Sequence, residues 1–449
     1  MIEELATGTA KRNIRIAFHT LGCKLNFSET STISREFKKD KFIHVNFDSP
    51  ADVYVINTCS VTENAEKKFE VLTRKALRYN PKAFIAAIGC FAQLQPISLS
   101  SVKGVKLVLG ANEKFKLKEY LIDLIEKPRS ISHSCEIDTV TDFESSFSLG
   151  TRVRSFLKIQ DGCDYKCSYC TIPKARGISR SDKLNNILKK IEQITAKGVK
   201  EIVLTGVNIG DYSERSKNGK GKCLNNFLDL LYAIEELEGP KRVRISSIEP
   251  NLLSDQIIEF ISSSKVFVPH FHIPLQSGSD KILKRMKRRY LINHYKSRVK
   301  KIKELIPNAC IGADVIVGFP GETDDDFLDT YNFINDLDIS YLHVFTYSER
   351  PNTESINFSD VVSIEKRKKR SLLLRKLSSR KKNHFYKSQI GKSSNILLEN
   401  ENRKGYINGY TENFIRVRAP WDPNITNNLI KGNLEKIDSD GYVRYKVLI

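Results

Sequence analysis

The sequence predicts an α/β fold in three parts: an N-terminal open parallel α/β sheet domain, a central partial barrel of six β/α units, and a small C-terminal β-barrel. Three observations lead to this prediction. Short apolar runs alternate with amphipathic segments up to residue 127, six further strand-like runs with helical spacing follow, and short alternating runs end the chain. A chain of 449 residues is long enough for two or three domains, each with its own core.

The N-terminal domain is expected over residues 1–127. Its clearest strands lie in NIRIAFHTLGC, ADVYVINTCS, KAFIAAIGC and KLVLGANE, and each ends in a turn. Strands that alternate with helical segments predict a parallel sheet, because each crossover between parallel strands needs a long connection. Residues 128–150 are Ser-rich and have no sustained periodicity, so we expect an interdomain linker there.

The central barrel is expected over residues 151–362. Its six strand-like runs lie in SFLKIQDGC, EIVLTGVN, VRISSIEP, FHIPLQSG, IGADVIVGFPGE and YLHVFTYSERP. In such folds the loops after the strands carry the chemistry, and here those loops are rich in Cys, Gly, Ser and Glu. A basic helical connector is expected over residues 363–388. Strand-sized runs separated by Asn, Gly, Asp or Pro predict the β-barrel over residues 389–449.

Composition and charge narrow the class of protein. Hydrophobic residues make up 40% and charged residues 28% of the chain, which excludes intrinsic disorder. A net charge of +20 favours a polyanionic partner such as RNA, although solvated lysines alone give the same excess. No segment resembles a signal peptide or reaches the ~20 apolar residues of a membrane span, so we expect a cytoplasmic protein without a membrane partner. Nine cysteines, an odd number, favour metal or redox use over disulfides.

A triad of cysteines follows the first barrel strand. Cys163, Cys167 and Cys170 have CxxxCxxC spacing within QDGCDYKCSYCTIP. Three thiolates on one tight loop can hold three irons of a 4Fe-4S cluster and leave the fourth iron open to a small chelating molecule. The alternative is a zinc site. Zinc normally takes four ligands, however, and the next histidines in the sequence are the distant His133 and His270.

This barrel triad resembles the motif of the radical S-adenosylmethionine superfamily, in which an aromatic residue, here Tyr169, precedes the last cysteine. The resemblance implies that S-adenosylmethionine chelates the open iron and is cleaved to a deoxyadenosyl radical. It also implies that residues at the ends of later strands line the cofactor site, with a role as strand-end caps as the alternative. Those residues are Thr205, Gly206, Asn208, Ser246, Glu249, Gln276, Ser277, Gly278, Ile316, Val317 and Gly318.

A first triad, of Cys23, Cys59 and Cys90, is spread through the N-terminal domain. Each cysteine comes at the carboxyl end of a predicted strand. Ligands of open α/β sheets bind in the crevice outside those ends, so the three thiols are expected to converge there. Gly22 and Gly89 suit a close approach of the backbone to a bulky group. The sequence therefore predicts a second three-ligand cluster, with small buried hydrophobes as the alternative.

Two triads in this order resemble the radical S-adenosylmethionine methylthiotransferase family. The resemblance covers nearly the whole chain and includes a terminal β-barrel like the family's TRAM module. TLGCKLN, from Thr20 to Asn26, is similar to the branch acting on N6-threonylcarbamoyladenosine in tRNA, whereas the isopentenyladenosine branch usually reads TYGCQMN and the ribosomal-protein branch SLGCPKN. CSYCTIPKARGISRS, HIPLQSGS and VGFPGE agree with the first branch. Leu25, Phe27 and Lys174 depart from its usual Val, Gln and Tyr.

The family resemblance implies the reaction and its partners. An aromatic C–H bond is too strong for acid–base chemistry, so replacing hydrogen by sulfur at C2 calls for a radical. One S-adenosylmethionine would methylate sulfur held at the first triad, and another would supply the radical, which gives a 2-methylthio product at adenosine 37. The implied cofactors are two 4Fe-4S clusters and S-adenosylmethionine, and the implied partners are the tRNA anticodon arm, a sulfur donor and an electron donor such as a flavodoxin.

Three alternatives for the function stay open. Two are methylthiolation of isopentenyladenosine in tRNA and of a ribosomal-protein aspartate. The third, of another class, is a non-catalytic iron-sulfur protein that binds RNA. The sequence singles out no individual catalytic residue.

Two basic segments are expected to contact phosphates. The connector from Glu365 to Lys387 mixes leucines with many basic residues, and a solvated helix face is the alternative reading of it. The segment from Lys284 to Tyr290 is expected to reach the anticodon arm. In the last module, four aromatic residues are candidates for base stacking: Tyr406, Tyr410, Phe414 and Trp421.

Overall fold

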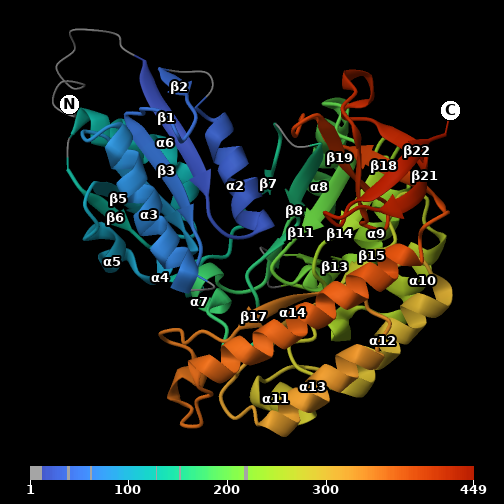
Figure 1. Cartoon of the computed structure of the whole chain (residues 1–449). Coiled ribbons are helices and arrows are strands. Elements are labelled where there is room, and N and C mark those ends of the chain that lie inside the picture. Colours follow the sequence, from blue (N-terminus) through green and yellow to red (C-terminus); the bar gives the residue numbers. More distant parts are fainter. Residues whose placement is uncertain are drawn as a thin grey trace. The chain divides into compact units, whose positions relative to one another are not determined.

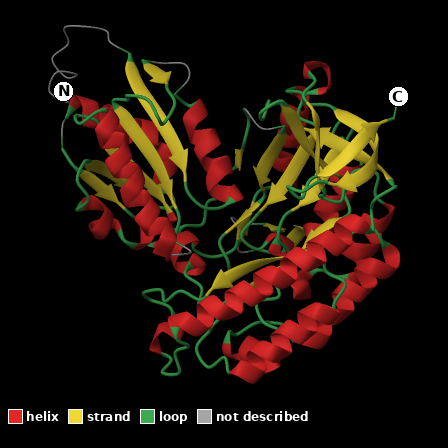
Figure 2. Ribbon diagram, in the orientation of Figure 1, coloured by secondary structure: helices red, strands yellow, loops and turns green. Residues whose placement is uncertain are grey.

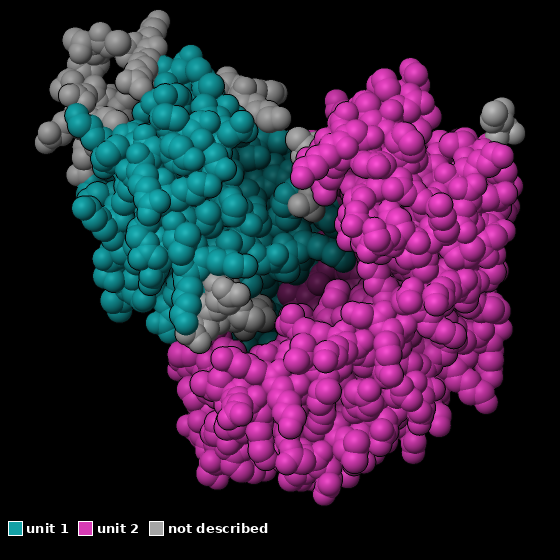
Figure 3. All heavy atoms as spheres, in the orientation of Figure 1, with its two compact units in different colours: residues 1–148, 156–165, 170–180 teal, residues 149–155, 166–169, 181–449 magenta. Residues whose placement is uncertain are grey.

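The computed structural model describes residues 13–37, 41–60, 63–127, 129–150, 153–216 and 221–448. The expected domain limits at residues 1, 128, 151 and 449 lie outside these ranges, as do the first twelve residues, where no signal peptide is expected. The chain forms two compact units (Figure 3). The first unit contains residues 1–148, 156–165 and 170–180, and the second contains residues 149–155, 166–169 and 181–449.

The first unit is built on a six-stranded sheet of order β2-β1-β3-β4-β5-β6 in which every pairing is parallel (Figure 1). The open parallel α/β sheet expected from the sequence is confirmed. The chain runs from β1 to β2 on one side and then to β3 on the other side of β1. This reversal makes the carboxyl ends of β1 and β3 the switch point where ligands of such sheets bind. The strands are β1 Ile14–Thr20, β2 Phe42–His44, β3 Val53–Thr58, β4 Phe84–Gly89, β5 Val105–Leu109 and β6 Ile131–His133.

Helices cover both faces of this sheet (Figure 2). Val55 shares a buried cluster with Ile33 of α2 and Leu121 of α6, whereas Ile56 shares one with Phe69 of α3. Successive strand residues point to opposite faces, so a strand covered on both sides must be apolar throughout. The helices are α2 Lys24–Arg35, α3 Glu63–Tyr79, α4 Cys90–Leu94, α5 Pro96–Ser100, η1 Glu113–Lys116 and α6 Leu117–Glu126.

The segment expected as a linker contributes to the first unit. Within it, β6 extends the parallel sheet, and β7 Ser146–Phe147 pairs antiparallel with β8 Arg154–Lys158. The Ser146 hydroxyl lies 3.1 Å from the Ser28 hydroxyl of α2. Backbone pairing needs no hydrophobic periodicity, which is why this segment reads as a linker in the sequence. The nearby short elements are η2 Ile137–Thr139, β9 Gln160–Asp161, α7 Ile172–Arg176 and β10 Arg180–Ser181.

All six strands expected in the barrel are present: β8, β11 Glu201–Thr205, β14 Arg242–Ile245, β15 His270–His272, β16 Cys310–Val317 and β17 Tyr341–Thr346. In the second unit β11 pairs with β14, and β16 pairs with both β15 and β17, always in parallel. An isolated bridge between Ser247 and His272 continues this order from β14 to β15. The intervening helices are α8 Leu184–Ala196, α9 Phe227–Glu235, α10 Asp255–Ser263, α11 Asp280–Arg285, α12 Ile292–Leu305 and α13 Asp324–Asp336, and β12 Ser213–Arg215 pairs with β13 Cys223–Asn226.

The C-terminal part of the second unit contains α14 Ile364–Lys387 and a closed barrel of order β18-β19-β20-β22-β21, which confirms the expected small β-barrel. Two arginines of β14 hold this barrel in place. Arg242 donates to the Thr411 carbonyl at 2.9 Å, and Arg244 donates to the Glu412 carbonyl at 3.1 Å. In the described ranges, none of the helices combines the length and apolar character that crossing a membrane requires. The strands are β18 Ser393–Leu398, β19 Tyr406–Thr411, β20 Arg416–Pro420, β21 Leu429–Ile437 and β22 Val443–Val447.

Candidate active site

The cysteines of the first triad lie just beyond three neighbouring strands. Cys23 follows β1 and is the N-cap of α2, Cys59 directly follows β3, and Cys90 follows β4 and opens α4. The register pairs Thr58 with Gly89, so the ends of β3 and β4 are level. The structure therefore brings the three loops to one edge of the sheet, at the switch point.

Buried amides hold these loops. Asn26 Nδ2 donates to the carbonyl oxygens of Leu21 and Thr58 at 3.0 and 2.9 Å, so one side chain ties the backbone ahead of the first two cysteines. Asn57 Nδ2 donates in turn to the Asn26 carbonyl at 3.0 Å. Both amides are fully buried, and loss of a buried partner costs about 1–3 kcal/mol, so the backbone here is tightly fixed.

Two glycines shape the space around the thiols. Gly22 has φ +96°, and a Cβ there would lie 2.9 Å from Cys59 Sγ. Gly89 has φ +100°, and its Cβ would lie 2.2 Å from Asn57 Oδ1. Both positions have a backbone conformation that favours glycine, and at both a side chain would collide with its neighbours. Three thiols in such a cradle are a donor set that fits a three-thiolate iron-sulfur cluster.

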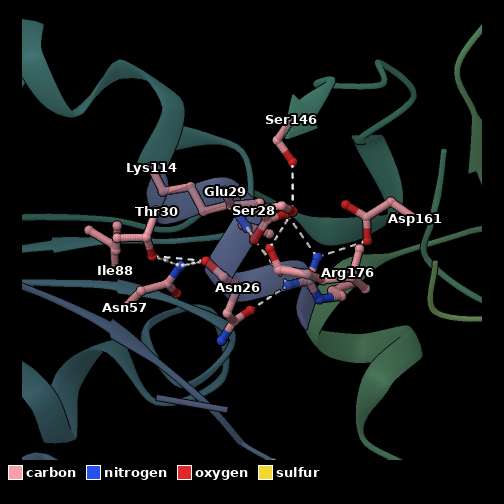
Figure 4. Close-up of polar contacts among 12 residues, drawn as sticks. Asn26, Ser28, Glu29, Thr30, Asn57, Ile88, Lys114, Ser146, Asp161 and Arg176 are labelled. Atoms are coloured by element: carbon pink, nitrogen blue, oxygen red, sulfur yellow. Dashed lines mark hydrogen bonds and ion pairs between the residues drawn. The ribbon is translucent and has the colours of Figure 1, made fainter. Parts of the chain in front are cut away.

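A buried charged cluster shares Asn26 with these loops (Figure 4). Arg176 of α7 donates to Asn26 Oδ1 at 2.6 Å. Its guanidinium also donates to both carboxylate oxygens of Glu29 at 3.0 and 3.1 Å, and to Asp161 Oδ1 at 2.9 Å. Neither acidic side chain is more than 5% exposed. Arg176 therefore links α2, which starts beside Cys23, to the segment that follows the barrel triad.

Two lysines complete this Glu29 cluster, which consists of Glu29, Lys114, Lys158, Asp161 and Arg176. Lys114 Nζ lies 2.7 Å and Lys158 Nζ 3.1 Å from the Glu29 carboxylate. Desolvation alone would raise the pKa of Glu29, but Arg176 and the lysines outweigh it and hold this pKa well below its ordinary value. Sequence reasoning missed the cluster because its members come from separate elements. The one local signal is the i, i+3 spacing that places Glu29 and Asn26 on one face of α2.

The barrel triad lies on the loop between β9 and α7. Cys163 N donates to the Gly177 carbonyl at 3.0 Å, and Tyr165 N donates to Cys163 Sγ at 3.4 Å. Gly162 has φ +70°, and a Cβ there would lie 1.9 Å from the Ile178 carbonyl oxygen. Only glycine fits this close approach of two backbones, which fixes the direction in which the cysteine loop leaves β9. All three thiols of the triad are partly exposed.

Arg288 contacts the second barrel cysteine. Its Nη1 donates to Cys167 Sγ at 3.2 Å, and its Nη2 pairs with Glu249. The side chain is only 4% exposed, and the neighbouring Tyr290 is buried with its hydroxyl bonded to backbone carbonyls. The expectation that the whole segment from Lys284 to Tyr290 reaches RNA is therefore wrong for Arg288 and Tyr290. Their buried contacts could not be read from a run of basic letters.

Four residues nominated for the cofactor site have surroundings that bear on that role. Tyr169 and Ile316 pack against the same buried cluster, in which the Tyr169 ring meets Phe319 edge to face at 6.2 Å. Ser246 Oγ and Gln276 Oε1 are buried, and neither has a hydrogen-bond partner among the described residues. Buried polar atoms without a protein partner are available to a bound molecule or to water, so the chemistry of these two atoms fits a polar cofactor.

Other nominated positions serve packing. A Cβ at Gly278 would lie 2.7 Å from Thr330 Cα, and Ser277 Oγ lies 3.3 Å from Thr330 Oγ1. Gly318 has φ +74°, and its Cβ would lie 2.2 Å from Arg367 Cγ. These three residues therefore set the approach of α13 and α14 to the barrel. The remaining nominated residues lie at or just after the ends of β11, β14 and β16: Thr205, Gly206, Asn208, Glu249 and Val317.

A second group of polar side chains that the sequence did not predict lies on three adjacent strands. His272 Nε2 of β15 and His343 Nδ1 of β17 lie 2.8 and 3.2 Å from the same Asp314 oxygen of β16. Desolvation alone would raise the pKa of Asp314, but the hydrogen bonds from both imidazoles hold it well below its ordinary value. The possible metal-ligating atoms of these three residues lie within 4.8 Å of one another, which is also the spacing in a divalent metal site. The hydrogen bonds to Asp314 explain this spacing without a metal.

The basic residues of the connector are only in part exposed. Arg367 and Arg370 are 4% and 3% exposed, and they pair with Glu349 and Glu322. The expectation that these two arginines contact phosphates is wrong, because packing of α14 covers them. The exposed basic residues of α14 are Lys366, Lys368, Lys369, Arg375, Lys376, Arg380 and Lys387.

The four aromatic candidates for base stacking differ in their surroundings. Phe414 and Trp421 pack against the core of the small barrel, as most aromatics in so small a module do. Tyr410 stacks on Phe414 with ring centroids 4.9 Å apart. Tyr406 has two guanidinium groups over its ring, that of Arg418 at 5.1 Å and that of Arg444 at 5.0 Å, so this aromatic residue lies beside two positive charges.

Comparisons with known proteins identify the class. Residues 157–334 match the Radical SAM superfamily, and residues 15–110 match Uncharacterized protein family UPF0004. The first match contains the barrel triad, and the second contains the first triad. With its CxxxCxxC loop and six barrel strands, the chain is a radical S-adenosylmethionine enzyme. Its cofactors are S-adenosylmethionine and a 4Fe-4S cluster, which sets aside the zinc alternative for the barrel triad.

Relatives narrow the class further. Threonylcarbamoyladenosine tRNA methylthiotransferase MtaB of Bacillus subtilis is 37% identical over 429 residues, which cover 94% of each chain. The protein of that name from Aquifex aeolicus is 37% identical over 90% of this chain and 96% of its own. The tRNA-2-methylthio-N(6)-dimethylallyladenosine synthase of Lawsonia intracellularis is 33% identical over 94% of this chain and 95% of its own. The chain belongs to the family of radical S-adenosylmethionine tRNA methylthiotransferases. A non-catalytic role is thereby set aside.

Among solved structures, the radical S-adenosylmethionine methyltransferase TsrM from Kitasatospora setae, with cobalamin and a 4Fe-4S cluster bound, has a TM-score of 0.56. It is 12% identical and covers 77% of each chain. Its complex with tryptophan and a cofactor analogue gives a TM-score of 0.55 at 11% identity, over 74% of this chain and 72% of that one. At these identities the likeness shows a shared fold.

Proposed function

We propose that this enzyme converts N6-threonylcarbamoyladenosine at position 37 of tRNA to its 2-methylthio derivative with the help of two 4Fe-4S clusters. The observation that carries the proposal is the gathering of Cys23, Cys59 and Cys90 at one sheet edge of a chain that also has the barrel triad. The TLGCKLN sequence and the names of the Bacillus and Aquifex relatives support the choice of substrate.

The chain's own residues would hold and orient the reacting groups. The chemistry supplied at the two triads is reductive cleavage of S-adenosylmethionine to a deoxyadenosyl radical at one and delivery of methylthio sulfur at the other. Arg288 donates to Cys167, and Ser246 and Gln276 offer buried polar atoms to the cofactor. Asn26 fixes the first triad's backbone. Each of these contacts reduces the freedom of a group that must be placed within a fraction of an ångström.

Recognition of tRNA would use the C-terminal half of the second unit. The exposed basic face of α14 and the Tyr406–Arg418 pair of the small, TRAM-like barrel would bind the anticodon arm through phosphates and stacking. We propose three functional domains: residues 1–127 hold the first triad's cluster, residues 151–362 carry the radical chemistry, and residues 389–449 bind RNA. A sulfur donor and an electron donor such as a flavodoxin complete the proposed partners, in the cytoplasm.

The test is anaerobic reconstitution of the full chain, followed by an iron and sulfide count. S-adenosylmethionine, a reductant and tRNA carrying threonylcarbamoyladenosine are then supplied, and the tRNA is digested for nucleoside mass analysis. The expected result is about eight irons per chain and a new 2-methylthio nucleoside, because each triad supports one four-iron cluster. About four irons with cofactor cleavage and an unaltered nucleoside would overturn both the second cluster and the substrate.

One alternative substrate has specific support. The Lawsonia relative is named for dimethylallyladenosine and is nearly as similar as the relatives named for threonylcarbamoyladenosine. The same assay with tRNA carrying isopentenyladenosine decides between the two. A higher kcat/KM on that tRNA would reassign the substrate and leave the reaction unchanged. Methylthiolation of a ribosomal-protein aspartate has no such support, because the relatives described above are all named for tRNA.

A further inference from the structure

The Glu29 cluster contains more positive than negative charge. Counted as ionised groups, its five members carry three positive and two negative charges, and no member is more than 5% exposed. An uncompensated charge inside a protein costs several kcal/mol. The surplus positive charge therefore calls for an anion close by.

The first triad is where an anion would lie. α4, which Cys90 opens, packs against α7, which carries Arg176. Asn26 supplies a direct connection, since it accepts from Arg176 and donates to the two carbonyls that precede Gly22 and Cys59.

We propose that Arg176 is a positioning residue for a 4Fe-4S cluster at Cys23, Cys59 and Cys90. Through Asn26 its guanidinium fixes the backbone that carries the thiolates, and its positive charge balances the cluster. Three thiolates on a four-iron core of charge 2+ leave one net negative charge, which is opposite in sign to the surplus of the Glu29 cluster. Arg180, whose guanidinium lies 3.6 Å from Asp161, adds a further positive charge beside the cluster. This inference rests on the second cluster of the proposed function.

Charge and positioning can be separated by choice of substitution. Arg176→Gln removes the positive charge and part of the hydrogen bonding. Arg176→Lys keeps the charge but loses the planar fork that reaches Asn26, Glu29 and Asp161 at once. Lys114→Gln removes a positive charge from the same cluster and leaves the contact between Arg176 and Asn26 intact.

The experiment uses the full chain with Cys163, Cys167 and Cys170 all changed to Ala, so that only the first triad can hold iron. After anaerobic reconstitution, iron is counted before and after a chelator challenge, and the cluster is titrated with a reductant under electron paramagnetic resonance. Positive charge stabilises the reduced cluster. Arg176→Gln should therefore lower the ratio of reduced to oxidised cluster about tenfold at a fixed potential, a shift of about 59 mV for one electron.

The other variants have their own expected results. Lys114→Gln should shift the potential in the same direction. If Arg176→Gln does not fold, Lys114→Gln tests the effect of the lost charge in its place. Arg176→Lys should keep the parent potential but lose iron faster to the chelator. Arg244→Gln, which removes a buried arginine paired with Glu201 in the second unit, is the matched control and should change neither quantity.

The outcomes separate this inference from the proposed function. If the parent with only the first triad binds no iron, the second cluster is wrong and this inference fails with it. If the parent binds about four irons while neither Arg176→Gln nor Lys114→Gln changes potential or retention, only the role of Arg176 is overturned.

Discussion

The Arg288 guanidinium donates a hydrogen bond to the Cys167 sulfur at 3.2 Å while it pairs with the Glu249 carboxylate. One buried side chain thus connects a cysteine of the barrel triad to the loop after β14, where a nominated cofactor residue lies. The same arginine lies over the Tyr290 ring, 5.1 Å from its centroid, so its orientation is fixed on three sides.

Arg288→Gln should slow cleavage of S-adenosylmethionine about tenfold or more, because a hydrogen bond to a charged group contributes about 1.5–3 kcal/mol. The measurement is the rate of deoxyadenosine formation at equal iron content. Arg289→Gln, which changes the exposed neighbour, is the control and should keep the parent rate. Equal rates for both variants at full iron loading would show that the Cys167 contact does not matter for cleavage.

Gly22→Ala should impair iron binding at the first triad, because the new Cβ would lie 2.9 Å from Cys59 Sγ in addition to the strain of a positive φ. Gly198→Ala is the matched control, since Gly198 has φ +79° and open space around its Cβ position. Both variants carry backbone strain of about 1–2 kcal/mol, so only the clash differs. Iron per chain is the measurement, and equal values would contradict the prediction.

Asp314→Asn should lower methylthio product formation at least tenfold while iron content stays unchanged. The carboxylate accepts from both His272 and His343, and an amide cannot hold both imidazoles in the same way. Asp325→Asn, an exposed change on α13, serves as the control. Product formation is followed by nucleoside mass analysis. A normal rate would show that this hydrogen-bonded group is not needed for the reaction.

Stability of the second unit should fall in acid because of Glu201. Its neighbours Arg244, Arg242 and Arg154 outweigh the desolvation that alone would raise its pKa, and they lower this pKa from 4.5 to about 2. A depressed folded-state pKa means that the stabilisation, about 3 kcal/mol, is complete above pH 4.5 and is lost as the pH falls toward 2. Unfolding of the parent and of Glu201→Gln is compared at several pH values. The difference between them should shrink steadily below pH 4.5, and a constant difference would contradict the assignment.

Replacing the exposed Lys368, Lys369 and Lys376 of α14 by Gln should weaken tRNA binding and flatten its dependence on salt by up to about one unit of slope per lost phosphate contact. The control is the same substitution at three exposed lysines that lie on or beside α8: Lys183, Lys189 and Lys197. Binding is measured over a range of salt concentrations. Equal slopes for the two triple variants would place the RNA elsewhere.

Much of this protein was determined by the sequence itself. CxxxCxxC is a local pattern, since three ligands on one loop need no distant partner. The first triad was predictable for a different reason: parallel strands have their carboxyl ends at one sheet edge, so cysteines after three strands must share that edge. The central strands of the sheet and those of both barrels were predictable because a strand buried on both faces is continuously apolar, and turn residues separate short strands. The short edge strands β2 and β6 were not, because three residues show no periodicity.

Tertiary structure alone decided what the arginines do. Arg176, Arg288 and Arg367 look alike in the sequence, yet each is buried against carboxylates from distant elements. Whether a guanidinium faces water or a buried acid depends on which helix packs over it, and that packing joins residues separated by long stretches of chain. An arginine is buried only where it has an acidic partner, because desolvation makes an unpaired buried charge costly.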